Sequence, residues 1–93
     1  MSPKFKWDEH KAASNFTKHR VGFSEAGTVF GDSFFITFFD EDHSIDEDRY
    51  ITIGLSSRNR LLLIAHTDRD GQIRIISARK ATSNERKFYE EGL

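Results

Sequence analysis

The second half of the sequence contains three strand-like segments separated by polar links of only three or four residues. Residues 49–57 alternate between apolar and polar side chains, and residues 72–78 carry three isoleucines. Residues 60–67 contain an unbroken run of five apolar residues, which predicts a central strand covered on both faces. Parallel strands need a connection of about a dozen residues or more, so links this short predict antiparallel hairpins.

Two helices are expected before these strands. Asp8 stands at an N-cap position and begins a helix that runs to about residue 19. The spacing of its residues places on one face Ala12, Ala13, Phe16 and His19. Ser24 is a suitable N-cap for a second, shorter helix, which Gly31 ends.

Two short strands and a final helix complete the expected elements. Residues 4–7 alternate between lysine and aromatic residues, and residues 34–39 are aromatic and β-branched. Thr82 with Glu85 three residues later is a capping-box signature, so a helix starts there, with Phe88 as its expected anchor. Helices grouped before and after consecutive strands predict the α+β class, with an antiparallel sheet of four to five strands.

Composition excludes several classes of protein. The chain has 93 residues and no cysteine, which rules out a disulfide scaffold and a thiolate zinc site. Its nine phenylalanines argue against intrinsic disorder. No apolar run approaches the roughly 20 residues of a membrane span, and the N-terminus lacks the apolar stretch of a signal peptide. We therefore expect one domain, residues 1–93, located in the cytoplasm.

An acidic segment, residues 40–48, has six acidic residues in nine positions. It is interpreted as a solvated hairpin loop; a metal site is the alternative, but the glycine and ligand spacing of a calcium-binding loop are missing. No two of the four histidines lie three or four residues apart on one expected element. The sequence thus predicts neither a metal ion nor another cofactor.

Basic residues are concentrated in residues 58–87, which hold eight Lys and Arg and only three acidic residues. Six of the eight are arginines, which suit bidentate contact with phosphate groups. This distribution points to nucleic acid, and a solvated face with local ion pairs is the alternative. RNA carries its own nucleophile, the 2′-hydroxyl, so histidine, arginine and lysine suffice to cleave it without a metal.

Three residues are singled out for chemistry. Arg74 lies between isoleucines of an expected strand, so it must point to a groove, to a partner or to an acid on a neighbouring strand. Arg79 ends that strand beside the amides of the final helix, where a phosphate could bind; an acid partner is again the alternative. His66 closes the central strand and suits proton transfer at neutral pH, or it is a histidine at the edge of the core bonded to the backbone.

The order of short motifs along the chain is distinctive. Residues 5–9 read Phe-Lys-Trp-Asp-Glu, residues 18–19 Lys-His, residues 49–56 Arg-Tyr-Ile-Thr-Ile-Gly-Leu-Ser, and residues 73–79 Ile-Arg-Ile-Ile-Ser-Ala-Arg. Together with His66 and the Thr82–Glu85 pair, these segments resemble the BrnT family of toxins over nearly the whole chain. The family usually has glycine after the Lys-His pair, where this chain has Arg20.

The resemblance implies a ribonuclease toxin of a type II toxin–antitoxin pair, with a RelE-like α+β fold. It also implies a BrnA-type antitoxin that binds and silences the toxin, in a complex that binds operator DNA through the antitoxin. The positions that match the family's motifs are Lys18, His19, His66, Arg74 and Arg79.

The leading hypothesis is a metal-independent endoribonuclease that cuts cellular RNA and so inhibits translation. Arg74 and Arg79 are expected to hold the scissile phosphate, with His66 as the catalytic proton-transfer group. RNA is expected to contact Lys18, His19, Arg58, Arg60 and Lys80. The alternative is a module that binds an antitoxin or nucleic acid without cutting; direct DNA binding by this chain is less favoured, because no helix-turn-helix pattern is present.

Overall fold

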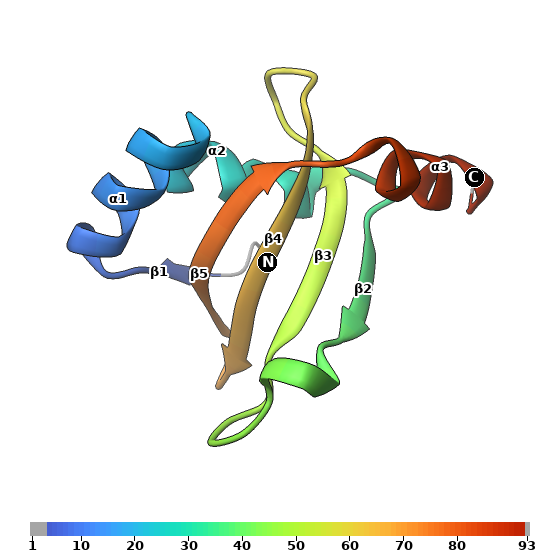
Figure 1. Ribbon diagram of the computed structural model, residues 1–93. Coiled ribbons are helices and arrows are strands. Elements are labelled where there is room, and N and C mark those ends of the chain that lie inside the picture. Colours follow the sequence, from blue (N-terminus) through green and yellow to red (C-terminus); the bar gives the residue numbers. More distant parts are fainter. Residues whose placement is uncertain (1–3, 93) are drawn as a thin grey trace.

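The computed structural model describes residues 4–92, which fold around one five-stranded sheet (Figure 1). In sheet order the strands are β1 (Lys4–Lys6), β5 (Gln72–Lys80), β4 (Leu61–Arg69), β3 (Tyr50–Leu55) and β2 (Ile36–Phe39). The four strands from β2 to β5 are antiparallel neighbours, which confirms the α+β class and the two hairpins. The short β1 pairs in parallel with β5, because two helices separate it in sequence from the other strands.

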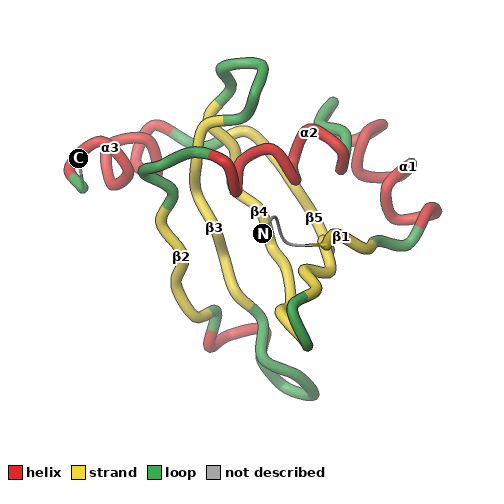
Figure 2. Tube along the Cα trace, turned by 180° about the vertical axis from the view of Figure 1, so that it is seen from behind, coloured by secondary structure: helices red, strands yellow, loops and turns green. Residues whose placement is uncertain are grey.

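Helices lie on both faces of this sheet (Figure 2). One face is packed against α1 (Glu9–His19), α2 (Phe23–Thr28) and a 3₁₀ turn at Val29–Gly31, and we call it the covered face. The opposite face carries α3 (Ser83–Glu91) at one end only, and we call it the open face. A second 3₁₀ turn, Glu41–His43, lies in the acidic loop. Among residues 4–92, no helix has the length and apolar character needed to cross a membrane.

The helix starts follow local side-chain chemistry in two of three cases. The Asp8 side chain accepts hydrogen bonds from the amides of His10 and Lys11, at 2.8 and 3.1 Å, as expected for the N-cap. The capping box of Thr82 and Glu85 is also confirmed. The expectation for Ser24 was wrong: the N-cap of α2 is Gly22, because the side chain of the first helical residue, Phe23, is buried in the core.

The inner faces of the helices differ from the expectation by one residue. On α1, Asn15 is buried, whereas Ala13 and Phe16 are exposed. On α3, the expected anchor Phe88 is 51 % exposed, whereas Tyr89 is only 8 % exposed. In both cases the buried side chain is the one whose polar atoms find partners inside the protein, which apolar periodicity does not reveal.

Strand β4 is the central strand that the apolar run predicted. Leu62 and Ile64 enter the core of the covered face, and Leu61 and Leu63 face the other side. The ladder between β4 and β5 contains one irregularity: Ala65 pairs with Ser77 and His66 with Ile75, so Ile76 is left without a partner. This β-bulge shifts the alternation of β5, so that residues before and after it keep their apolar side chains on the covered face.

Arg20 takes the place of the glycine that usually ends such a first helix. Its backbone is left-handed, with φ 58° and ψ 31°, and its amide donates to the carbonyl of Phe16 at 2.8 Å. The helix therefore stops at His19 without a glycine. Two residues of the tight β4–β5 turn, Asp70 (φ 52°) and Gly71 (φ 77°), also have positive φ angles.

Candidate functional site

A row of polar and basic side chains crosses the open face of the sheet. The strand register places Lys6 beside Arg74, and Arg74 beside Thr67. Arg49 precedes the pair of Tyr50 and His66 by one residue, so it lies opposite Thr67 and extends the row. Neighbouring strands are about 4.8 Å apart, so three cations from three distant parts of the chain stand within one row.

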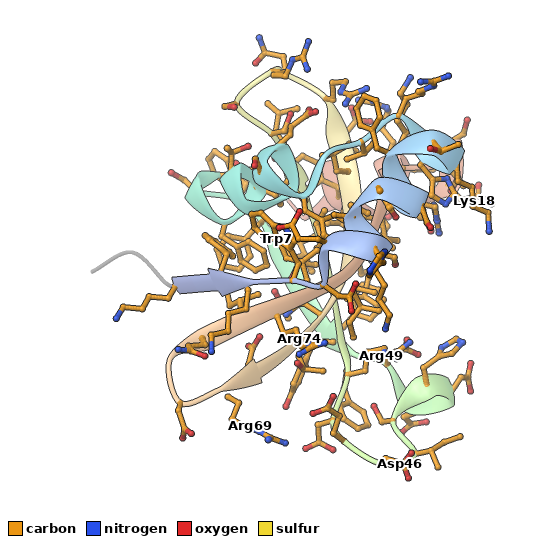
Figure 3. The ribbon with its side chains drawn as sticks, turned by 90° about the vertical axis from the view of Figure 1, so that its left-hand side faces the viewer. Trp7, Lys18, Asp46, Arg49, Arg69 and Arg74 are labelled. Carbon is orange, nitrogen blue, oxygen red and sulfur yellow. The ribbon has the colours of Figure 1, made fainter. Side chains whose placement is uncertain are left out.

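This row forms the floor of a hollow of 520 Å³, which we call the basic groove. Its lining residues are Lys6, Lys11, Glu47, Arg49, Thr67, Arg69, Gln72, Arg74 and Ile76. Five of these are cations and one is an acid; Glu47 accepts from Arg69 at 3.3 Å. Arg74 is exposed, and it makes no ion pair with any of residues 4–92. Figure 3 shows Arg74 and Arg49 together on this face, with Arg69 nearer the β4–β5 turn.

A second hollow of 320 Å³ continues from the first along α1. It is lined by His10, Lys11, Ser14, Asn15, Lys18, His19, Ile76 and Ser77. Lys11 and Ile76 line both hollows, so the two join at the β-bulge and form one surface, the basic band. The structure thus brings together three of the expected residues, Lys18, His19 and Arg74.

Sequence reasoning missed much of this band. Lys6, Lys11, Arg49 and Arg69 were not assigned to the site. One signal was present: residues 4–7 alternate, which places the lysines on the face opposite the aromatic rings. The positions of Arg49 and Arg69 follow only from the register of β3, β4 and β5, and that of Lys11 follows from the packing of α1 beside β5.

His66 lies on the covered face and is 1 % exposed. Its Nε2 is 2.7 Å from Thr52 Oγ1 and its Nδ1 is 2.8 Å from Asp68 Oδ1. Phe30 packs edge-on against the ring at 5.1 Å. Burial lowers the pKa of His66, and Asp68 only partly opposes that shift. The ring therefore does not face the basic groove, and its partners are side chains rather than the backbone.

Arg79 is held by an acid on the final helix. Its guanidinium donates two hydrogen bonds to the carboxylate of Glu85, at 2.8 and 2.9 Å, and the pKa of Arg79 is raised by that partner. Arg79 and Arg74 are five residues apart on β5, roughly 16 Å at about 3.3 Å per residue. The expectation that both arginines hold one phosphate does not fit this spacing, and Glu85 lies where the phosphate was expected.

The remaining expected RNA contacts lie at the other end of the sheet, around the β3–β4 link (Figure 1). Arg60 donates to Glu25 through Nε at 2.9 Å and to the carbonyl of Arg20 at 3.0 Å. Glu25 is nearly buried, and the hydrogen bond from Arg60 lowers its pKa. Arg60 is therefore occupied in joining the link to α2. Arg58 is exposed but lies 4.0 Å from the same carboxylate of Glu25, and Lys80 is exposed.

The arrangement can bind phosphate and move protons, but it offers no cage for a metal ion. Several guanidinium and ammonium groups converge on the basic band, and two imidazoles, His10 and His19, line it. Nowhere in the part of the chain that the structure describes do three His, Asp or Glu side chains gather as metal ligands. A chain of nucleotides lying along the band would meet cations over its whole length.

Comparison with known proteins identifies the family. The model of the family described as "Ribonuclease toxin, BrnT, of type II toxin-antitoxin system" matches residues 7–85. The fold is similar to the 1.1 Å crystal structure of the Brucella abortus ribonuclease toxin BrnT, with a TM-score of 0.67 and 20 % sequence identity, over 87 % of this chain and 99 % of that one. No curated protein matched the sequence. Because the family model spans most of the chain, the protein belongs to the BrnT family of ribonuclease toxins of type II toxin–antitoxin systems.

Proposed function

We propose that this toxin is a metal-independent endoribonuclease that binds single-stranded RNA along the basic band. The observation that carries the proposal is Arg74: an exposed arginine with no acid partner among residues 4–92, at the centre of a row of cations on an open sheet face. An unpaired guanidinium is free to bind a phosphate with two parallel hydrogen bonds. By cutting cellular RNA in the cytoplasm, the toxin would inhibit translation. A BrnA-type antitoxin would neutralise the toxin by binding it, and the complex would bind operator DNA through the antitoxin.

In this mechanism the RNA supplies the nucleophile. A base removes the proton of the 2′-hydroxyl, the oxygen attacks the adjacent phosphorus, and an acid protonates the 5′-oxygen that leaves. Negative charge accumulates on the phosphate oxygens as the attack proceeds. Arg74 stabilises that charge, and Lys6 and Arg49 on either side hold the neighbouring phosphates.

Proton transfer is assigned to His19 rather than to His66. His19 lies at the end of α1 beside Lys18 and lines the basic band, whereas His66 is closed off in the core. We give His66 a positioning role: it binds Thr52 and Asp68 on the covered face, directly behind the strand position of Thr67. Arg79 supports α3 through Glu85, and Arg58 and Lys80 are retained as peripheral RNA contacts.

The test is incubation of the purified chain with a defined single-stranded RNA, with and without EDTA. We expect cleavage that survives EDTA and falls roughly 10²–10³-fold in Arg74→Ala, as when one charge-stabilising donor is removed from an active site. Arg86→Ala, an exposed arginine on α3 outside the band, is the matched control and should cleave as the wild type does. Cleavage abolished by EDTA, or unchanged in Arg74→Ala, would refute the proposal.

One observation favours a second candidate, a module that binds RNA or an antitoxin without cutting. The histidine at the motif position, His66, is buried and both ring nitrogens are engaged. That candidate predicts RNA binding along the band but no cleavage products from a chain shown by circular dichroism to be folded.

A further inference from the structure

Strand β2 is an open edge of the sheet. Its only neighbour among the described strands is β3. The amide of Asp40 donates to the carbonyl of Arg49 at 2.9 Å, and backbone bonds alternate along an antiparallel pair. Ile36 and Phe38 therefore turn their backbone groups toward β3, and Thr37 and Phe39 turn theirs outward. Such a row of outward N–H and C=O groups is a template for another strand.

The two edges of the sheet are built differently. The other edge, β1, is three residues long, and two of the three are lysines, a usual device against unwanted strand pairing. Strand β2 has no charged residue, no proline and no bulge. The contrast indicates that the β2 edge is left open for a partner.

Aromatic side chains flank this edge on both faces of the sheet. On the open face, Phe38 is 40 % exposed and meets Phe88 of α3 edge-on at 6.1 Å. These two rings and Ile53 line an apolar cleft of 370 Å³. On the covered side, exposed Phe39 packs edge-on against Tyr50. An added strand would place alternate side chains against Phe38 and Phe88 on one face and against Phe39 on the other.

The charge around β2 selects the kind of partner. Residues 32–48 contain seven acidic residues and no lysine or arginine. This region would repel the phosphates of RNA, which the basic band attracts. A polypeptide that carries lysine or arginine beside apolar residues is complementary to it.

We propose that the β2 edge binds an extended segment of the antitoxin, which adds a sixth strand to the sheet. The segment has apolar side chains over the Phe38–Phe88 cleft and lysine or arginine over residues 40–48. This rests on the proposed function, because the type II toxin family supplies the partner. Asp40, the residue after β2, donates its amide to the carbonyl of Arg49, which ends the basic row, so a partner on this edge also lies next to the basic groove.

The experiment compares the free toxin with its complex with the cognate antitoxin. Hydrogen–deuterium exchange should slow at the amides of Thr37 and Phe39 in the complex. Phe39→Pro removes an outward N–H at an edge where proline is tolerated, and it should weaken antitoxin binding by roughly tenfold or more in calorimetry. Phe88→Ser, at a side chain that is 51 % exposed, is a second variant with the same expectation, and circular dichroism checks that both variants are folded. Phe16→Ala, an exposed phenylalanine on α1, should bind as the wild type does.

RNA cleavage by each free variant separates this proposal from the proposed function. Cleavage should be unchanged in Phe39→Pro and Phe88→Ser, because neither residue lines the basic band. If the wild type does not cleave RNA but protection at β2 appears, the docking site stands and the ribonuclease proposal fails. Equal antitoxin binding by all variants would overturn the docking site. Two other results would also overturn it. One is a loss of RNA cleavage in the variants with unchanged antitoxin binding, which would make the rings an RNA-stacking platform. The other is self-association of the free toxin that Phe39→Pro abolishes.

Discussion

Asn15 joins α1, which forms one side of the basic band, to β5, the strand that carries Arg74. Its Nδ2 donates to the carbonyls of Val21 and Ala78, at 3.0 and 2.8 Å, and its Oδ1 accepts from the amide of Ala78 at 3.1 Å. The side chain is only 7 % exposed, so water does not replace these bonds. Asn15→Ala would leave two backbone carbonyls and one amide of the core without a partner.

The size of the effect follows from those three bonds. At a net contribution of about 1 kcal/mol each, their loss costs about 3 kcal/mol. Alanine is the better helix former by about 0.6 kcal/mol, which offsets part of that cost. We expect a net loss of about 2.5 kcal/mol in the free energy of unfolding. At about 4–8 °C per kcal/mol for a domain of this size, the midpoint of thermal unfolding should fall by about 10–20 °C.

Urea unfolding followed by circular dichroism measures this loss directly, with Ser14→Ala on the exposed side of α1 as the control. The control should stay within about 0.5 kcal/mol of the wild type. Asn15→Asp should be no better than alanine, because a carboxylate would face two carbonyls in place of the amide that donates to them. A loss below about 1 kcal/mol in Asn15→Ala, with an unchanged dependence on urea, would refute the reasoning.

Three further outcomes are expected from local geometry. In Gly54→Ala the added Cβ would lie 2.7 Å from Val29 Cγ1 and 3.0 Å from Phe35 Cβ, so we expect the free energy of unfolding in urea to fall by about 1–3 kcal/mol. The control Gly31→Ala, where nothing lies within 4 Å of the added Cβ, should change little. Equal stability of the two variants would show that the contact at Gly54 relaxes freely. The pKa of Glu25 is lowered from 4.5 in the folded state, chiefly by Arg60, so the unfolded state binds more protons in acid. The stability that this pair contributes is fully present above about pH 4.5 and is lost as the pH falls through the lower pKa of Glu25 in the folded state. The free energy of unfolding, measured from about pH 7 to about pH 3, should therefore fall less steeply in Glu25→Gln than in the wild type. Parallel curves would contradict this. Arg79→Ala breaks the half-exposed pair with Glu85 and should cost about 0.5–1 kcal/mol while RNA cleavage is retained; lost cleavage at full stability would instead give Arg79 the phosphate-binding role that its sequence position suggested.

The structure shows which kinds of inference hold when they are made from sequence. The cap at Asp8, the capping box at Thr82 and the two hairpins each depend on residues a few positions apart, and each is confirmed. The second helix start and the anchor of α3 were misplaced by one or two residues, because they depend on which side chain the core buries. Ser24 and Phe88 had suitable chemistry, but Phe23 and Tyr89 had the contacts.

The same distinction between local and long-range contacts applies to the candidate site residues. That Arg74 must point to a groove, a partner or an acid followed from its place in an apolar strand, and it lines a groove. For Arg79 and His66 the sequence left two interpretations open, and for Arg60 it predicted an RNA contact. The acids that bind Arg60 and Arg79 come from other elements, as does Thr52 beside His66, whereas the second partner of His66, Asp68, lies on the same strand. No local pattern reveals a partner that is 35 residues away, as Glu25 is from Arg60.

By itself, the sequence determined the α+β class, the central strand, most helix boundaries and the resemblance to the BrnT family, because these follow from periodicity and short motifs within the chain. Only the tertiary structure decided that cations at 6, 49 and 74 form one row, that α1 continues it, and that His66 lies behind it. The reason is register: a shift of one residue in a strand turns every side chain to the opposite face, and that register is fixed by core packing and by the bulge at Ile76.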